Sequence, residues 1–474
     1  MIEISVKKDR YMYNVYHLTK AFFSEEEIRQ QVDGGQKPLV ELRIDGGFSF
    51  CVGPEEVNVQ EPGHEKRILT QIVYRKLSEE TGRQLSWGML TGVRPTKMIM
   101  QRLEKGEKEE DLAGYLEKEY FISPEKAYLG IEIAKREQSL LDKLDYQQGY
   151  SLYIGIPFCP SICSYCSFSS APIAQWRGQL DNYVDALCRE LRALGKMAKG
   201  RKLNTVYIGG GTPTTLSVVQ LEKVLLTVSQ SFPMENMAEY TVEAGRPDSI
   251  TEEKLQVIRH YPVTRISINP QTMQQKTLDI VGRRHTVGEV KEAFYKAREA
   301  GFDNINMDLI AGLPGENASD MADTLAQVEG LMPDSLTVHA LAIKRAAKFG
   351  QEGVKQRSGP EIQEMIESAG KAAARMGMKP YYLYRQKNIA GNFENVGYAK
   401  VDKAGIYNIL IMEEKQTILA AGAGATTKIV LPEKIRMKNG KETNLIRMEN
   451  VKNITEYMKR IDEMIERKGE WLWR

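Results

Sequence analysis

The pattern of hydrophobic and polar residues changes near residue 150. Before that point, short stretches of alternating apolar and polar residues are followed by long stretches with helical spacing. After it, short apolar runs and longer amphipathic stretches follow one another in turn. Alternation and short apolar runs are typical of strands, and apolar residues at helical spacing are typical of helices. The chain is therefore predicted to have a mixed N-terminal domain and then a region of repeated strand and helix.

The region before residue 150 is predicted to form a separate α+β domain. Residues 2–6 and 11–16 alternate like the two strands of a hairpin. Residues 39–44 and 48–52 are predicted to form a second hairpin, because a glycine-rich turn separates them. Residues 64–141 have a broken helical pattern. No group of side chains here points to catalysis, so the role of this domain stays open.

The region after residue 150 is predicted to be a partial (β/α)6 barrel of the α/β class. Strand-like runs lie at residues 152–156, 205–208, 240–243, 265–268, 305–310 and 335–341. Amphipathic stretches lie between them, as at residues 180–197, 219–231 and 287–300. Such alternation produces a parallel sheet with right-handed crossovers. We assign residues 1–149 to the N-terminal domain, 150–345 to the barrel and 346–474 to an α+β extension that covers the site.

Composition limits the classes of protein that need to be considered. The chain has 474 residues with a formal net charge of +2, so no global field favours nucleic acid or a membrane surface. No apolar run reaches the length of a membrane span. The N-terminus lacks the apolar core of a signal peptide. With 5 cysteines and no disulfide framework, the chain is expected to be cytoplasmic.

Three of those cysteines, Cys159, Cys163 and Cys166, lie in one short loop. Pro157 and Pro160 end the preceding strand, so the thiols are expected at the carboxyl end of that strand. Soft thiolates select iron–sulfur clusters, zinc or copper. Four cysteines would close a cluster or a structural zinc site, whereas three leave one metal position open for another ligand. The alternatives are a zinc site with a distant fourth ligand and a chance grouping.

Polar residues at the other strand ends point to a small-molecule site. Glu243 and Asp308 each end a strand, and Gln271 follows another one. Reactive groups gather at the carboxyl ends of barrel strands. Arg283 suits a carboxylate, and a strand-end aspartate suits the hydroxyls of a ribose. The run Gly209-Gly210-Gly211 lets a ligand approach the backbone closely and is expected to offer bare N–H groups.

The cysteine spacing, with Tyr165 just before the last cysteine, resembles the signature of the radical S-adenosylmethionine (SAM) superfamily. The resemblance implies that Cys159, Cys163 and Cys166 hold a [4Fe–4S] cluster. It also implies that the open iron is chelated by the amino and carboxylate groups of SAM. One electron then cleaves SAM to methionine and a 5′-deoxyadenosyl radical.

A closer resemblance covers about residues 150 to 430. The sequences GGGTPT and DLIAGLPGE, together with Glu243, Gln271 and Arg283, resemble the oxygen-independent coproporphyrinogen III oxidase family. The long N-terminal region is similar to that of an N-terminally extended bacterial branch of the family. The family implies that two propionates of coproporphyrinogen III become vinyls, giving protoporphyrinogen IX in heme biosynthesis. A reduced flavodoxin or ferredoxin is the implied electron donor, and the final electron acceptor stays open.

The same resemblance implies roles for individual residues toward SAM. Glu243 would contact its amino group, and Arg283 its carboxylate. Gln271 and Asp308 would contact its ribose end. The remaining residues implied to line SAM are Tyr153, Gly210, Gly211 and Thr212, with Phe168 and Ala342 near the adenine.

The sequence departs from the family pattern at three points. The family's best-studied members have His at Gly155 and a fourth cysteine at Phe168. Their Asp-Pro is replaced here by Gly245-Arg246-Pro247. Two alternatives therefore stay open: another radical SAM enzyme acting on heme or a porphyrin, such as a ring-opening methyltransferase, or a heme-binding chaperone without turnover. A His-Asn pair of the chaperones has no counterpart at residues 406–409, which counts against the chaperone.

A basic and aromatic rim is one interpretation of two later stretches. Lys344 and Arg345 follow the last strand of the barrel, and residues 381–387 contain three tyrosines, Arg385 and Lys387. Such a rim would suit a flat tetrapyrrole with several propionates. A solvated charged loop is the equal alternative. His339, within the last strand, is expected in the core or on the wall of a cleft.

Overall fold

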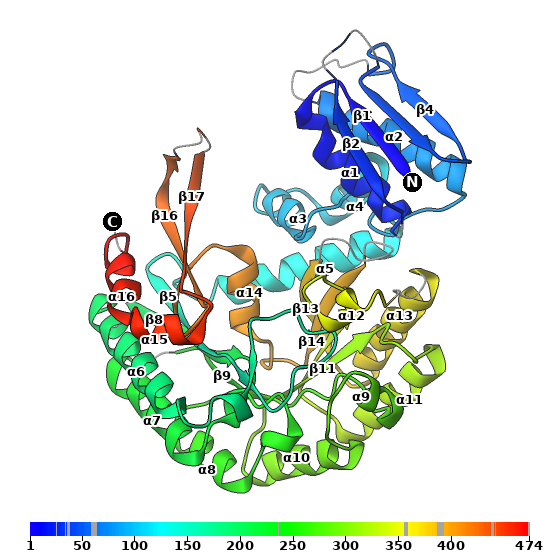
Figure 1. Ribbon diagram of the computed structural model, residues 1–474. Coiled ribbons are helices and arrows are strands. Elements are labelled where there is room, and N and C mark those ends of the chain that lie inside the picture. Colours follow the sequence, from blue (N-terminus) through cyan, green and yellow to red (C-terminus); the bar gives the residue numbers. More distant parts are fainter. Residues whose placement is uncertain are drawn as a thin grey trace.

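The protein consists of a barrel with a smaller N-terminal part beside it (Figure 1). The computed structural model describes residues 1–24, 26–33, 35, 38–57, 64–235, 237–354, 359–385, 393–437, 440 and 442–472. No helix in these ranges is long and apolar enough to cross a membrane.

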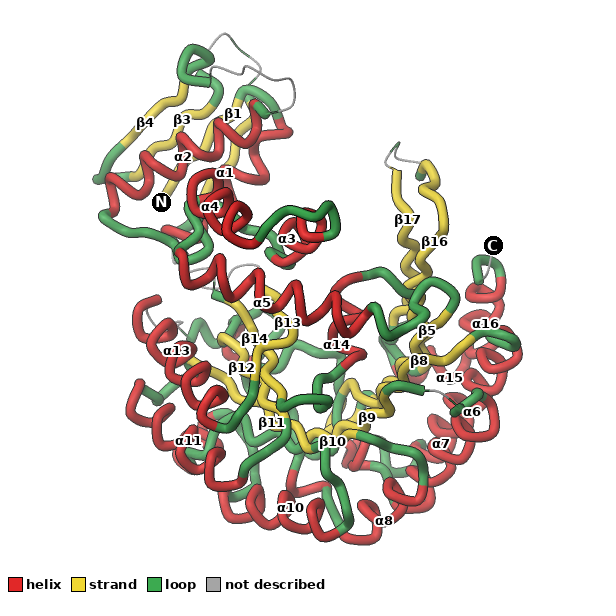
Figure 2. The backbone as a smooth tube through the Cα atoms, turned by 180° about the vertical axis from the view of Figure 1, so that it is seen from behind, coloured by secondary structure: helices red, strands yellow, loops and turns green. Residues whose placement is uncertain are grey.

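The N-terminal part contains a 4-stranded sheet with the order β2-β1-β3-β4. The strands are β1 (Ile2–Val6), β2 (Ile28–Val32), β3 (Val40–Ile44) and β4 (Ser49–Val52). Helices α1 (Asp9–Phe22) and α2 (Glu65–Thr81) pack beside the sheet (Figure 2). The strand predicted at residues 11–16 is wrong, because this segment lies inside α1. Tyr11, Val15, Leu18 and Phe22 are buried at helical spacing, and over this longer window the helical period prevails over the local alternation.

Three helices join this part to the barrel: α3 (Thr96–Leu103), α4 (Glu109–Tyr120) and α5 (Pro124–Leu141). Ser123 caps α5, because its side chain accepts a hydrogen bond from the Lys126 N–H. Ala127, Ile131 and Ala134 of α5 belong to the same buried core as the barrel strands. The N-terminal sheet has a core of its own. The domain boundaries at residues 149 and 345 stay predictions.

The barrel is built from parallel strands with helices around its outside (Figure 1). The strands are β5 (Gly149–Ile156), β8 (Lys202–Gly210), β9 (Glu239–Glu243), β10 (Arg265–Ser267), β11 (Ile305–Ala311) and β12 (Ser335–Ala340). The outer helices are α6 (Leu180–Met197), α7 (Val218–Ser231), α8 (Glu252–His260), α10 (Val287–Glu299), α11 (Ala318–Leu331) and α13 (Gly359–Arg375). Shorter elements are β6 (Phe158–Cys159), β7 (Ala171–Pro172), α9 (Gln275–Ile280) and α12 (Lys348–Gln351). The predicted α/β class and partial barrel are confirmed.

Later segments extend the barrel sheet at both edges, so that it has 11 strands. Beyond β12 lie β14 (Glu394–Ala399) and β13 (Lys379–Arg385), both antiparallel to their neighbours. Beyond β5 lies β15 (Thr417–Ala421), which is parallel to β5 and pairs Thr417 with Tyr150. The hairpin of β16 (Thr426–Arg436) and β17 (Glu442–Glu449) follows and projects away from the barrel (Figure 2).

Helix α14 (Ile406–Glu413) lies across the side of the barrel that the parallel barrel strands leave open (Figure 2). The Glu239 carboxylate accepts hydrogen bonds from the Ile406 and Tyr407 N–H groups at the start of this helix. Tyr407 is buried and stacks on Tyr207 of β8, with 4.5 Å between ring centroids. The C-terminal extension therefore supplies part of the barrel interior.

The C-terminal helices α15 (Ile454–Lys459) and α16 (Ile461–Gly469) pack on α6 around a buried carboxylate, Glu190. Its oxygens accept hydrogen bonds from the Tyr457 hydroxyl at 2.6 Å, from Asn450 at 2.9 Å and from the Gly422 N–H at 2.9 Å, and they pair with Lys468. Both Glu190 and Lys468 are almost fully buried. This cluster fixes the turn after β15 to the end of the chain.

Candidate active site

The cysteine loop begins where β5 ends and is tied to two neighbouring loops. The Ser164 N–H donates to the Val281 carbonyl at 2.9 Å, and the Ser161 hydroxyl donates to the Gly282 carbonyl at 3.0 Å. On the other side, the Thr212 N–H donates to the Phe158 carbonyl at 2.7 Å. These bonds fix the loop to the rim of the barrel at the carboxyl ends of its strands.

Cys159, Cys163 and Cys166 all line one hollow of about 240 Å³. The Thr212 hydroxyl donates to Cys159 Sγ at 3.6 Å. Burial raises the pKa of the Cys159 and Cys166 thiols, so metal binding would have to release their protons. Within the described ranges, no three His, Cys, Asp or Glu side chains are already arranged to hold a metal ion.

Gly211, which follows β8, packs against the start of the cysteine loop instead of offering a free donor. The Gly211 N–H donates to the Ile156 carbonyl at 2.7 Å, and the next N–H is bonded to Phe158. A Cβ on Gly211 would lie 2.5 Å from the Phe158 carbonyl oxygen, so any side chain would separate the two loops. The expectation of a bare N–H group is therefore wrong at Gly211, although Gly211 lines the hollow.

Glu243, at the end of β9, is held toward the barrel interior by Tyr207. The Tyr207 hydroxyl donates to Glu243 Oε1, and a Cβ on Gly209 would lie 2.9 Å from the carboxyl group. Burial, together with the Asp308 charge, raises the pKa of Glu243 to about 7, and the Tyr207 bond opposes that rise. The group is therefore poised to ionise near neutral pH when a cation approaches.

Arg283 lines the hollow, and its guanidinium is partly engaged by backbone carbonyls. Its Nη1 donates to the Asn269 carbonyl and to the Pro270 carbonyl, the latter at 2.9 Å, and Nη2 donates to the Gly245 carbonyl at 3.3 Å. Its Nε is buried and has no hydrogen-bond partner among the described residues. Because an orphaned buried donor is costly, this N–H fits a ligand acceptor such as a carboxylate.

Gln271 and Asp308 lie next to each other in the backbone. The Gln271 N–H donates to the Asp308 carbonyl at 2.9 Å, and Gln271 has a φ of 68° in the left-handed region. Such strain in a non-glycine residue is concentrated at functional sites. Burial alone raises the pKa of Asp308, but His339 and a 2.7 Å hydrogen bond from Asn306 lower it below its ordinary value. Asp308 is therefore an ionised acceptor on the wall of the hollow.

The structure brings nearly all the proposed site residues to one place. The hollow is lined by Cys159, Cys163, Cys166, Phe168, Gly210, Gly211, Thr212, Glu243, Gln271, Arg283, Asp308 and Ala342. Tyr153 instead lines an adjoining hollow of about 340 Å³, which shares Phe168, Gly210 and Glu243 with the first. Phe168 is 73% exposed, on the rim common to both hollows.

The predicted aromatic and basic rim is only partly present. Lys344, Tyr384 and His339 line the first hollow, and the Tyr384 hydroxyl lies 3.2 Å from His339 Nδ1. Tyr381, Tyr382 and Arg385 are buried, so their assignment to the rim is wrong. Tyr381, Tyr382 and Leu383 are buried in succession, so β13 is covered on both faces here, and Arg385 is buried at its end. Arg345 does not line the hollow, and Lys387 lies outside the described residues.

Sequence reasoning missed Tyr207 and Asn269 and did not assign a role to Arg246. Tyr207 pairs in register with Tyr153 across β5 and β8, so strand alternation could have placed both rings inside the barrel. Asn269 and Arg246 line the hollow from loops. No signal in the sequence alone distinguishes such loop residues from solvated ones.

The comparisons with known proteins agree with this geometry. The radical SAM superfamily model matches residues 153–328. The oxygen-independent coproporphyrinogen-III oxidase-like protein HemZ of Bacillus subtilis (strain 168) is 43% identical over 371 residues, which is 77% of this chain and 74% of that protein. The chain therefore belongs to the HemZ family of oxygen-independent coproporphyrinogen-III oxidase-like proteins.

Two further likenesses are less extensive. The heme chaperone HemW of Bacillus subtilis (strain 168) is 36% identical over 202 residues, 42% of this chain and 52% of that protein. The solved structure of coproporphyrinogen III oxidase HemN from Escherichia coli, a radical SAM enzyme, has a TM-score of 0.55 at 22% identity. That match covers 69% of this chain and 73% of the other, and it shows a shared fold.

As a radical SAM protein, the chain uses a [4Fe–4S] cluster and SAM. The residues present fit both groups. Three thiols supply a cluster with one open position, and the two other cysteines lie elsewhere, in β4 and α6. The Glu243 carboxyl group and the orphaned Arg283 Nε suit an amino group and a carboxylate, the two groups at one end of SAM.

Proposed function

We propose that this protein oxidatively decarboxylates two propionates of coproporphyrinogen III to vinyls and gives protoporphyrinogen IX. The observation that carries the proposal is one hollow that combines the three cluster thiols with Glu243, Arg283 and Asp308. The 43% identity to a coproporphyrinogen-III oxidase-like protein supports the choice of substrate.

In this proposal each wall of the hollow has a separate task. Glu243 would accept hydrogen bonds from the SAM amino group, Arg283 Nε would bind its carboxylate, and Gln271 and Asp308 would orient its ribose. The Gly211–Thr212 backbone keeps the cysteine loop pressed to the barrel. When bound, the cluster and SAM supply the means to remove a hydrogen atom from an unactivated C–H bond.

The substrate would approach from the side of Lys344, His339 and Tyr384. Lys344 lines the hollow and has no ion-pair partner among the described residues, so its ammonium is available to a propionate. The Tyr384 hydroxyl and His339 are within 3.2 Å of each other and add hydrogen-bonding groups on the same wall. These residues would hold a propionate so that its β-carbon faces the SAM subsite.

The overall change at each propionate is a two-electron oxidation. The β-carbon loses a hydrogen atom, and the bond between the α-carbon and the carboxylate carbon then breaks. Carbon dioxide leaves, one electron passes to a one-electron acceptor, and a vinyl group remains. We infer that a reduced flavodoxin or ferredoxin supplies the electron that the cluster needs at the start of each cycle.

A heme-binding chaperone is the second candidate, favoured by the 36% identity to HemW over 202 residues. The two functions differ in turnover. A chaperone would bind heme stoichiometrically, and adding a porphyrinogen would not cause it to consume SAM. The oxidase would consume SAM only when its substrate is present.

The test is product analysis with the full-length protein. The protein is reconstituted with iron and sulfide without oxygen, reduced, and given SAM with coproporphyrinogen III or with heme. Mass spectrometry showing deoxyadenosine and the loss of two carboxyl groups from the porphyrinogen would support the oxidase. A methylated linear tetrapyrrole from heme would indicate a ring-opening methyltransferase. Heme binding without deoxyadenosine, from protein shown to carry its cluster, would favour the chaperone.

A further inference from the structure

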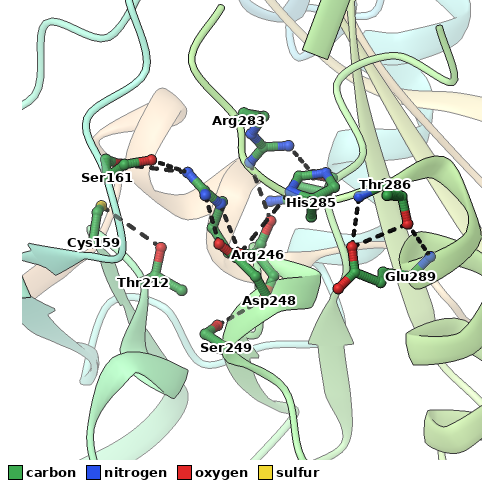
Figure 3. A network of polar contacts seen from close by, with 12 residues as sticks. Cys159, Ser161, Thr212, Arg246, Asp248, Ser249, Arg283, His285, Thr286 and Glu289 are labelled. Carbon is green, nitrogen blue, oxygen red and sulfur yellow. Dashed lines mark hydrogen bonds and ion pairs between the residues drawn. The ribbon is translucent and has the colours of Figure 1, made fainter. Parts of the chain in front are cut away.

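Arg246 is a buried arginine beside the cysteine loop that the proposed reaction does not use. It follows β9 by three positions and is 2% exposed. Its side chain extends from the barrel toward the loop that carries Ser161 and Cys163 (Figure 3). A guanidinium buried to this extent is normally fully engaged, and its contacts therefore indicate what it does.

The two edges of the Arg246 guanidinium have different partners. Nε and Nη2 donate to the two oxygens of Asp248 at 2.9 Å and 2.7 Å, which is a bidentate ion pair. Nη1 points the other way (Figure 3) and donates to the Ser161 carbonyl at 3.4 Å and hydroxyl at 3.3 Å. The same Nη1 lies 3.8 Å from Cys163 Sγ, within hydrogen-bond distance for sulfur.

We propose that Arg246 is a positioning residue that holds Cys163 in place through Ser161 and raises the reduction potential of the cluster that Cys163 ligates. The inference rests on the cofactor and not on the identity of the tetrapyrrole.

The charges around Arg246 leave its positive end facing the thiol. Burial alone raises the pKa of Asp248, but Arg246 lowers it below its ordinary value, so Asp248 is ionised on the side away from Cys163. His285, whose Nδ1 lies 4.0 Å from Asp248, is buried, and burial with the two arginines lowers its pKa to about 3. The imidazole is therefore uncharged and does not compete for Asp248.

A cation and an N–H donor near a ligand sulfur both favour the reduced cluster. Reduction adds one electron, and the added negative charge is stabilised by a nearby positive charge, more strongly in a buried site than in water. Hydrogen bonds to the sulfur and net charge are established determinants of cluster potentials. Thr212 gives Cys159 a neutral donor at 3.6 Å, whereas Arg246 gives Cys163 a charged one.

The pair Arg246 and Asp248 allows an electrostatic role to be separated from a structural one. Arg246→Gln removes the positive end and should lower the potential. Asp248→Asn removes the compensating negative end and should raise it. Loosening of the cysteine loop, by contrast, would be common to both variants and would shift the reduction potential in the same direction in both. Arg246→Lys keeps the charge without the planar fork and should lie between the wild type and Arg246→Gln.

The experiment is EPR-monitored potentiometry of the full-length, cluster-loaded protein without porphyrinogen. The signal reports only molecules that carry a cluster, so partial loading does not affect the result. We expect Arg246→Gln to lower the reduced-to-oxidised ratio at a fixed potential about tenfold, which is about 59 mV for a one-electron couple. The matched control is Arg259→Gln, an exposed arginine at the end of α8.

Potentials that stay at the wild-type value in Arg246→Gln and Asp248→Asn, or that shift in the same direction, would overturn the proposal. Where Arg246→Gln does not assemble a cluster, a potential above the wild-type value in Asp248→Asn and one below it in Arg246→Lys decide in favour of the proposal, and any other pair of shifts overturns it. Because no tetrapyrrole is present, failure of the proposed oxidase activity would leave this result unaffected.

Discussion

Glu243 is the residue whose protonation most directly links the site to pH. Its pKa is raised to about 7, mainly by burial, so it is largely protonated below neutral pH. In the proposed site the ionised carboxylate is the better acceptor for the N–H groups of the SAM amino group, and affinity for SAM should therefore rise with pH. We expect about an eightfold gain between about pH 6 and pH 7.5, measured by anaerobic equilibrium dialysis with cluster-loaded protein.

The matching substitution is Glu243→Gln, which should weaken SAM binding and remove most of this pH dependence. Glu253→Gln, an exposed glutamate on α8, should keep both the affinity and its pH profile. A pH profile that persists unchanged in Glu243→Gln would show that another group titrates.

The second prediction at the scale of the residue concerns the cysteines of the loop. Cys166→Ser removes one of the three thiols in the hollow and should leave little iron bound after anaerobic reconstitution. Cys51→Ser changes an exposed cysteine on β4 and should keep the wild-type iron content. Iron and sulfide analysis of the two variants checks this, and equal iron in both would exclude Cys166 as a ligand.

At this scale the sequence predicted much of the site, because strand ends in a barrel must meet. Glu243, Gln271 and Asp308 follow directly from that rule, and all three line the hollow. Contacts made by loops could not be predicted in the same way. The free N–H group expected at Gly211 donates to the Ile156 carbonyl, a pairing that depends on how the segment after β8 packs on the end of β5.

At the scale of elements, the buried pair Glu190 and Lys468 connects α6 with α16. Lys468→Met would leave Glu190 buried with one charged partner missing, and we expect a loss of about 3–5 kcal/mol in unfolding free energy. Urea unfolding of the barrel measures it. Arg460→Gln, in an exposed pair with Glu463, should leave the unfolding free energy close to its wild-type value.

The Lys468→Met variant should also disturb the wall of the second hollow, the one that Tyr153 lines. Glu190 holds the Gly422 N–H, and Ala423 and Gly424 beyond it line that hollow. An Lys468→Met protein as stable as the wild type would show that the pair adds nothing over a packed methionine.

The elements themselves were predicted best where a periodic pattern is long. The barrel strands and helix α6 lie where their patterns predicted them, because each strand is a short apolar run buried on both faces and α6 buries one continuous face. The strand predicted at residues 11–16 was wrong, because so short an alternation of apolar and polar residues also fits a helix. The insertion of α14 into the barrel had no local signal, because the burial of Tyr407 depends on Tyr207, which lies far away in the sequence.

At the scale of the whole molecule, one buried carboxylate fixes the N-terminal region to the barrel. Glu394 of β14 accepts hydrogen bonds from Trp87 Nε1 and from Lys126 Nζ, both at 2.7 Å. Trp87→Phe keeps most of the ring volume but removes one donor and leaves the carboxylate under-satisfied. We expect a loss of about 1–3 kcal/mol in stability, together with faster amide exchange in α5 and β14.

Hydrogen-exchange mass spectrometry checks this prediction peptide by peptide. The expected result is faster exchange confined to α5, β14 and their neighbours, with the cysteine loop unchanged. Exchange that is unchanged everywhere would mean that apolar packing of α5 on the barrel is sufficient for attachment.

The central claim is that the protein, with its cluster and SAM bound in the hollow, removes a hydrogen atom from a propionate of a porphyrinogen. The most direct measurement uses coproporphyrinogen III with deuterium at the β-carbons of its propionates, reduced cluster-loaded protein and SAM. The account predicts deuterium in the released deoxyadenosine, in step with the loss of carbon dioxide. Deoxyadenosine without deuterium, or no loss of carbon dioxide from a substrate that is bound, would contradict it.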